Sequence, residues 1–192
     1  MTTWWWIRHG PTHEKRFVGW RDVPADLSDT AQIARLSAYL PDDALLVSSD
    51  LIRASATADA IGQTRKRLPN EPLIREFNFG DWDGLSFKQI NEKHPDLCRA
   101  YWETPGDITP PNGESWNDAA GRIKQFVDRI NTEHPNRHII AVAHIGVIMT
   151  QIQLAGGLAP IEAISHKIDN LSVTRLQWDG SIWETGAINH LP

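Results

Sequence analysis

The hydrophobic positions of the chain gather in short runs, each followed at once by polar or turn-forming residues. The most abrupt run, Trp4–Ile7, stops at Arg8 and His9 ahead of a Gly-Pro pair. Ala44–Val47 and His138–Ala143 are similar runs, followed by serines and by a histidine. Runs this short and this apolar are typical of strands that are buried on both faces, as in a parallel sheet between two layers of helices.

Between these runs, apolar residues recur at the three- and four-residue spacing of one helix face. Polar residues that suit helix N-caps support three of the starts: Ser28-Asp29, Asp50, and Ser115 with its acidic partner Asp118. The pattern predicts helices over residues 30–40, 51–63, 86–93, 115–134 and 147–155.

The remaining segments complete the expected fold. Pro72–Arg75 is interpreted as a brief strand and Arg65–Arg67 as a solvated basic loop. Residues 172–178 and 181–186 are predicted to form a hairpin around a two-residue Asp179-Gly180 turn. Strands that alternate with helices predict an α/β fold, a three-layer sandwich with a mostly parallel central sheet, helices on both faces and a C-terminal hairpin. We expect residues 1–192 to form a single domain.

The composition narrows the classes of partner. Lys and Arg number 19 against 24 Asp and Glu, a net charge of −5, whereas nucleic acid and anionic membranes select a basic surface. We therefore expect neither as a partner. No apolar run reaches the ~18 residues of a membrane span and no signal-type segment is recognised, so a cytoplasmic location is expected. Cys98 is the only cysteine, which excludes a disulfide framework and a cysteine-based metal site.

Cationic and imidazole side chains follow three of the predicted strands. Arg8 and His9 come directly after the first apolar run, Arg53 shortly after the second and His144 directly after the third. The carboxyl ends of parallel strands meet at one edge of a sheet, where ligands of such folds bind, so we expect these four side chains to converge. Two arginines and two histidines suit a tetrahedral dianion such as phosphate, and the helix N-terminus at Arg53 favours an anion further.

The same group of side chains suits catalysis as well as binding. A histidine held among arginines can remain neutral, and neutral imidazole is a competent nucleophile toward phosphorus. Phosphoryl transfer also needs charge neutralisation, in-line placement and a proton for the leaving oxygen. The cations supply the first two, and Glu76, which lies before a Gly-rich loop, is the candidate proton donor.

The motifs around these residues carry a family resemblance. Arg8–Thr12, with the sequence Arg-His-Gly-Pro-Thr, resembles the signature of the histidine phosphatase superfamily, in its phosphoglycerate-mutase-like branch. Further motifs that resemble those of the family follow in the same order along nearly the whole chain, which makes the resemblance specific. These motifs are Gly19–Ser28, Ser48–Ala58, Glu76–Gly84, Pro111–Ser115 and His144.

The resemblance implies a role for each candidate. The residue that matches His9 is phosphorylated and then dephosphorylated by water. The residues that match Arg8, Arg53 and His144 hold the phosphoryl group, and the one that matches Glu76 acts as acid and then as base. These roles agree with those expected from the residues themselves.

Three further positions are expected at the phosphate: Thr12, Lys15 and Gly146. Many relatives have an Asn where this chain has Lys15, so a cation would replace one neutral contact. Ile145-Gly146 after the second histidine, in place of an Asp, resembles the branch whose proton donor is a Glu.

We therefore expect a phosphatase, a metal-independent phosphomonoesterase that hydrolyses a small phosphorylated metabolite through a phosphohistidine, with no cofactor. A phosphoglycerate mutase is the first alternative. It is disfavoured because Lys88, Lys93 and Arg99 are the only cations between Phe77 and Gly113 and are widely spaced. An α-ribazole phosphatase-like role in cofactor biosynthesis is another alternative.

Two alternatives come from other classes. A zinc hydrolase would use His9 and His13, whose spacing suits a metal on a helix, but Gly10-Pro11 breaks any helix there. A phosphate-binding module without turnover would need no acid such as Glu76.

Two features bear on the substrate and on assembly. Four tryptophans near the expected site either border it, which would suit a ring-bearing leaving group, or pack beneath loops: Trp20, Trp82, Trp102 and Trp116. The C-terminal hairpin would leave a free strand edge through which a homodimer could form.

Overall fold

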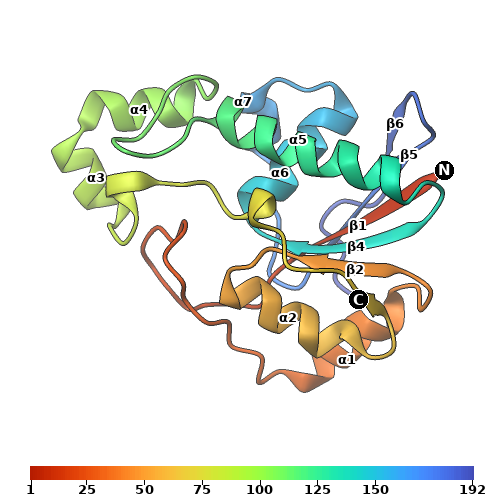
Figure 1. Ribbon diagram of the computed structural model, residues 1–192. Coiled ribbons are helices and arrows are strands. Elements are labelled where there is room, and N and C mark those ends of the chain that lie inside the picture. The colour runs from red at the N-terminus through yellow and green to blue at the C-terminus, as the bar shows by residue number, and fades with distance from the viewer.

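A six-stranded sheet forms the centre of the molecule, and the computed structural model describes all residues from 1 to 192 (Figure 1). The strand order is β3-β2-β4-β1-β5-β6. The first four strands along the chain pair in parallel, and the last two add in antiparallel fashion. The strands are β1 (Thr2–Arg8), β2 (Leu45–Ser48), β3 (Lys66–Arg67), β4 (His138–Ala143), β5 (Val173–Trp178) and β6 (Trp183–Thr185).

Helices cover both faces of this sheet, so the predicted three-layer α/β class is confirmed (Figure 1). α1 and α2 pack on one face, and α5 and α6 on the other. None of the helices combines the length and apolar character that crossing a membrane requires. The helices are α1 (Thr30–Tyr39), α2 (Ile52–Gly62), α3 (Phe87–Lys93), α4 (Pro95–Glu103), α5 (Trp116–Glu133), α6 (Ile145–Gly156) and α7 (Pro160–Ala163).

The run of tryptophans in β1 explains why this strand is central. Successive side chains of a strand point to opposite faces. Trp4 and Trp6 therefore stack on one face, with ring centroids 5.1 Å apart, and pack against α5. Trp5 and Ile7 face the other layer, where Ile7 is fully buried among α1 and α2. Both faces of β1 are thus covered, as the unbroken apolar run predicts.

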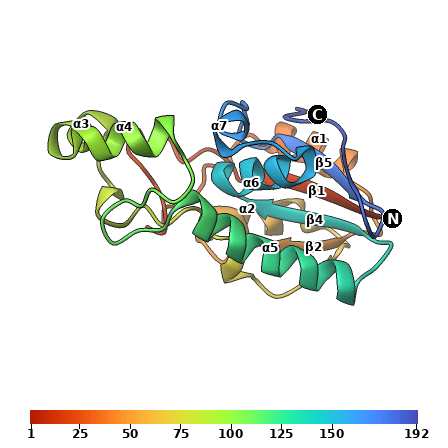
Figure 2. The ribbon, with the colours of Figure 1, turned by 90° about the horizontal axis from the view of Figure 1, so that it is seen from above.

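α3 and α4 stand apart from the layers, beyond the carboxyl ends of the parallel strands (Figure 2). They enclose a small core of their own, made of Trp82, Ile90, Cys98 and Tyr101. α3 begins at a capping box, in which Ser86 and Gln89 satisfy each other's backbone N–H groups. α4 is not among the predicted helices. Pro95 occupies its first turn, where the missing N–H of proline costs no helical hydrogen bond.

Two predictions near the sheet edge are wrong. Pro72–Ile74 is a 3₁₀ helix, capped by the Glu71 carboxylate, and not a strand. The basic Arg65–Arg67 segment supplies the edge strand β3 instead. Arg65 is buried, and its guanidinium donates to carbonyls at the C-terminal ends of α1 and α2, including Ser37 and Ile61. A cation in this place satisfies groups that a helix end leaves unpaired.

The predicted C-terminal hairpin is present, but its turn differs. Trp178 pairs with Trp183, so the loop has four residues and not two. The Asp179 carboxylate accepts from the backbone N–H groups of Ser181 and Ile182, which holds the wider loop. β6 forms one edge of the sheet.

Candidate active site

The register of β1 and β4 brings the two candidate histidines together. Arg8 lies opposite Ala143 at the ends of the two strands, and the backbone N–H of His9 donates to the carbonyl of Ala143 over 3.1 Å. His9 directly follows Arg8, and His144 directly follows Ala143. Their rings consequently meet, with centroids 5.1 Å apart.

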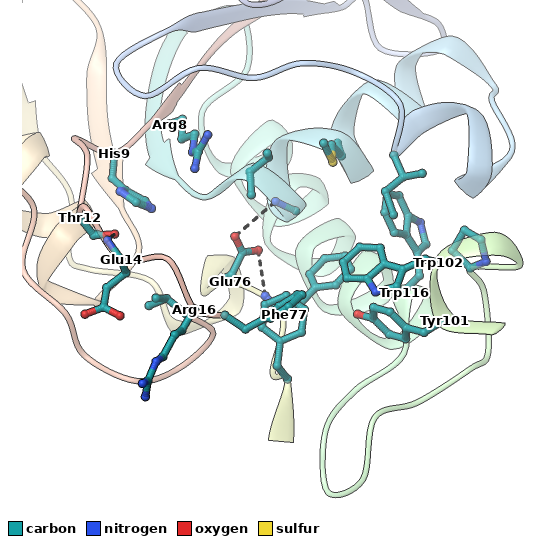
Figure 3. Close-up of a pocket in the computed structure, with 18 of the residues that line it drawn as sticks. Arg8, His9, Thr12, Glu14, Arg16, Glu76, Phe77, Tyr101, Trp102 and Trp116 are labelled. Carbon is teal, nitrogen blue, oxygen red and sulfur yellow. Dashed lines mark hydrogen bonds between the residues drawn. The ribbon is translucent and has the colours of Figure 1, made fainter. Parts of the chain in front are cut away.

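These strand ends open into a cavity of about 330 Å³ (Figure 3). Arg8, His9, Thr12, Arg53 and Glu76 line it together with Gly146. His144 lies directly behind His9 and is fully buried. The expected convergence of strand-end side chains is thus what the structure contains.

His9 is held in one tautomer. Its Nδ1 lies 2.7 Å from the carbonyl of Gly10, and since a carbonyl can only accept, Nδ1 carries the proton. The other ring nitrogen, Nε2, therefore keeps its lone pair. Burial, and after it the positive charges of Arg53 and Arg8, lower the pKa of His9 to about 3. His9 is accordingly a neutral imidazole at physiological pH, with Nε2 as a free nucleophile.

The backbone of His9 is fixed on both sides. Asn170 donates its side-chain amide to the His9 carbonyl over 2.8 Å. The N–H of Gly10 donates to the Thr57 hydroxyl, which itself donates to the carbonyl of Arg53. A Cβ at Gly10 would lie 2.6 Å from Leu27 Cδ2 and 3.2 Å from the carbonyl oxygen of Asp26, so a larger residue would displace the Leu27 side chain. The nucleophile is thus tied to the helix that carries the second arginine.

Both arginines are anchored by backbone carbonyls. Arg8 donates through Nη1 to Ile168, at 2.6 Å, and leaves its buried Nε without a partner. Arg53, in the first turn of α2, donates to Gly19 and Arg21 and is 1% exposed. Carbonyls hold the guanidinium groups without cancelling their charge. Two fixed positive charges therefore face the cavity.

Asp50, predicted to cap α2, has another role. Its carboxylate binds Arg75 through two hydrogen bonds, one of them 2.7 Å long. The first N–H of α2, that of Ile52, is instead capped by Asp22 from the loop before α1. This cap ties the loop to the helix that carries Arg53.

His144 has no hydrogen-bond partner on either ring nitrogen. Its burial, and after it the positive charge of Arg53, lower its pKa well below the ordinary value. A neutral imidazole has one N–H donor, and a buried donor without a partner is costly. This donor beside His9 suits an oxygen of a phosphoryl group carried on or near Nε2.

The Glu76 carboxylate lies at the centre of the pocket (Figure 3). It accepts from the N–H of Phe77 at 3.0 Å and from the N–H of Gly146 at 3.4 Å. Burial raises its pKa, against the opposing effects of the Phe77 N–H and Arg53. A carboxyl group with a raised pKa can hold a proton for release to a leaving group.

Gly146 is required by this carboxylate. A Cβ at this position would lie 2.5 Å from Glu76 Oε1 and 2.9 Å from the ring of Phe77. The missing side chain of Gly146 therefore makes room for the acid, and its N–H orients it.

Two candidates do not line the pocket: His144, which is buried against His9, and Lys15. The Lys15 side chain is exposed, while its neighbours Glu14 and Arg16 line the cavity mouth. Among the four tryptophans, Trp102 and Trp116 line the pocket, whereas Trp82 is buried in the α3–α4 core.

Arg122 was missed by the sequence analysis. Its guanidinium donates to the carbonyls of Leu73, Arg75 and Glu76 and to the Glu114 carboxylate. It thereby fixes the segment that carries the acid. Its position in the sequence could have indicated this role. Arg122 lies three residues after Ala119 on the buried side of α5, and a cation in such a place needs buried acceptors.

No group of three or more His, Cys, Asp or Glu side chains is placed to share a metal ion. His13, the second histidine of the zinc alternative, lies at the surface with its Nε2 2.8 Å from Asp26.

Fold and site together define an α/β protein with a neutral histidine, two arginines and a buried acid at one pocket, a set of side chains that suits a tetrahedral anion. A family model described as histidine phosphatase superfamily (branch 1) matches residues 4–190, and the chain belongs to this superfamily. The resemblance noted in the sequence is thereby confirmed.

Several known proteins are similar to this chain. A bifunctional protein of Mycobacterium tuberculosis is 29% identical over 91% of this chain, which spans only half of that relative's length. The glucosyl-3-phosphoglycerate phosphatase of the same organism is 32% identical, over 74% of this chain and 70% of its own. Among solved structures, Bacillus stearothermophilus YhfR has a TM-score of 0.91 at 25% identity, covering 100% of this chain and 98% of its own.

Proposed function

We propose that this protein is a phosphomonoesterase that works through a phosphohistidine on His9. The observation that carries the proposal is the neutral His9, whose Nδ1–H is fixed by Gly10 and whose Nε2 is free beside Arg8 and Arg53. A nucleophile needs a free lone pair and a nearby charge that stabilises the phosphoryl oxygens. Both conditions are met in one buried pocket.

In the first step, Nε2 of His9 forms a bond to phosphorus while the bond to the leaving oxygen breaks. Glu76 donates its proton to that oxygen, so the product leaves as an alcohol. Arg8, Arg53 and the N–H of His144 bind the three remaining phosphoryl oxygens, on which the negative charge resides. The acid contributes about 10²–10⁴ to the rate of such a step.

In the second step, water attacks the phosphohistidine. Glu76, now a carboxylate, takes a proton from the water as the new oxygen–phosphorus bond forms and the nitrogen–phosphorus bond breaks. Inorganic phosphate leaves, and His9 and Glu76 return to their starting states. No metal ion takes part in either step.

Hydrolysis is favoured over mutase chemistry by the distribution of charge. Lys88, Lys93 and Arg99 are all exposed and none lines the pocket. A mutase must hold its product for a second phosphoryl transfer, and a carboxylate-binding cluster would serve that purpose. The similarity to a glucosyl-3-phosphoglycerate phosphatase supports a small phosphorylated metabolite as substrate.

The proposal is tested with purified protein and p-nitrophenyl phosphate. His9→Ala is expected to abolish phosphate release, while His13→Ala, a surface histidine in the same loop, keeps wild-type activity. Rapid quenching with ³²P-labelled substrate should trap an acid-labile, base-stable phosphoprotein in the wild type and in His13→Ala only. Full activity of His9→Ala, or loss of activity with a chelator, would refute the proposal.

A further inference from the structure

Beyond Glu76 the pocket has an aromatic end. Phe17, Phe79, Tyr101, Trp102 and Trp116 line it, together with Ile108. The rings hold one another edge to face: centroids of Phe17 and Phe79 lie 5.2 Å apart, and those of Tyr101 and Trp102 5.0 Å apart. Such contacts fix the rings before any ligand enters. This end is therefore a preformed, ring-walled space.

The aromatic end has no charged side chain. The five charged residues that line the pocket are Arg8, Arg53 and Glu76 at the phosphate end, and Glu14 and Arg16 at the mouth. None comes from α4, α5, α6 or α7. A carboxylate or second phosphate on the leaving group would lose its water there without gaining a partner, which is strongly unfavourable.

Two polar groups interrupt this wall, the indole N–H of Trp102 and the hydroxyl of Tyr101. The hydroxyl of Tyr101 is buried without a hydrogen-bond partner, in a side chain that is only 4% exposed. Figure 3 shows its hydroxyl end directed into the pocket, towards the side where Glu76 lies. Burial and the negative charges of Glu76 and Glu114 raise the pKa of Tyr101, so its O–H remains a donor. Buried donors in native structures are normally paired, which indicates an acceptor on a ligand.

Resting on the proposed function, we infer that the substrate's leaving alcohol carries a flat, uncharged ring with a hydrogen-bond acceptor, which Tyr101 binds. The aromatic end supplies apolar contact to such a ring, and the hydroxyl fixes its orientation. The cavity of about 330 Å³ is at the small end of ligand sites, about 300–1,000 Å³. A compact metabolite fits this size.

The test compares three esters of primary alcohols, so that their leaving groups have similar intrinsic reactivity. These are 4-acetylbenzyl phosphate, benzyl phosphate and 3-phosphoglycerate. We expect kcat/KM to be highest for 4-acetylbenzyl phosphate and roughly 100-fold lower for 3-phosphoglycerate, whose carboxylate would be unpaired. Equal or better turnover of 3-phosphoglycerate would overturn the inference while leaving the proposed phosphatase intact.

Tyr101→Phe then removes only the hydroxyl. The preference for 4-acetylbenzyl over benzyl phosphate should fall by roughly tenfold, the size of one hydrogen bond. Tyr39→Phe, at the only other tyrosine and exposed on α1, should keep the wild-type preference. An unchanged preference in Tyr101→Phe overturns the role of the hydroxyl. If no ester reacts and no phosphohistidine forms, the proposed function itself fails, and the inference with it.

Discussion

Gly146→Ala tests the placement of the acid more finely than removal of the acid itself. The added Cβ would lie 2.5 Å from Glu76 Oε1, whereas an ordinary contact begins at 3.4 Å. The carboxylate must therefore move by about 0.9 Å, or the start of α6 must move instead. Either shift weakens the bond between the Gly146 N–H and Oε2, which is already 3.4 Å long.

The expected loss follows from this displacement. A misplacement of about 1 Å can lower a rate by ~10²-fold, because proton transfer needs close alignment. The loss should depend on the leaving group. Benzyl alcohol needs the proton and should lose about 100-fold in kcat/KM, whereas p-nitrophenolate leaves readily without it and should lose far less.

Gly121→Ala is the matched control. Gly121 lies within α5 and a Cβ there would meet no atom within 4 Å. Steady-state kinetics with both esters should therefore be unchanged, and the helix should gain roughly 0.5–1 kcal/mol of stability. Wild-type kcat/KM of Gly146→Ala for benzyl phosphate would show that Glu76 is not the proton donor.

Three further predictions concern titration, stability and charge. Because the pKa of His9 is about 3, protonation of His9 should not lower kcat down to about pH 5. As pH rises through the raised pKa of Glu76, kcat should fall, since the acid loses its proton. A loss of kcat on the acid side near pH 6.5 would refute the neutral state of His9. Arg65→Met should lower the free energy of unfolding by roughly 3 kcal/mol in urea titrations, because four backbone carbonyls lose a charged donor. In inhibition assays with inorganic phosphate, Lys15→Ala should change the inhibition constant by no more than about twofold, because its exposed side chain lies outside the pocket. Arg53→Ala should raise the same constant at least ~100-fold, because a buried charge beside the phosphate is lost.

The sequence predicted those elements whose own residues determine them. The unbroken apolar run of β1 and the capping box of Ser115 and Asp118 depend on local chemistry, and each is present. The 3₁₀ helix at Pro72–Ile74 and the edge strand β3 depend on the rest of the folded chain, since β3 forms by pairing with the free edge of β2. Local propensity does not include that information.

The site divides in the same way. Arg8, His9, Arg53 and Glu76 were predictable because each stands at or near the end of an element or a motif. Arg122 was not, because its acceptors lie far along the chain, and Tyr101 was not, because the pocket that it lines is built from segments far apart in the sequence. Asp50 illustrates the opposite error: a residue type suited to a cap binds Arg75 instead, because the folded chain offers it a cation.

The charges of the site also explain why a dianion should bind here before any chemistry occurs. With His9 and His144 neutral, Arg8 and Arg53 supply the positive charge at the phosphate end of the pocket, and the raised pKa of Glu76 favours the uncharged form of its carboxyl group. A phosphomonoester at neutral pH carries close to two negative charges. The bound dianion offsets the positive charges of the two arginines. Since both of these charges help to lower the pKa of His144, this pKa should rise when the anion binds. An NMR titration of His144 with vanadate bound should therefore show a pKa higher than in the free protein; an unchanged or lower pKa would mean that the anion does not lie between these groups.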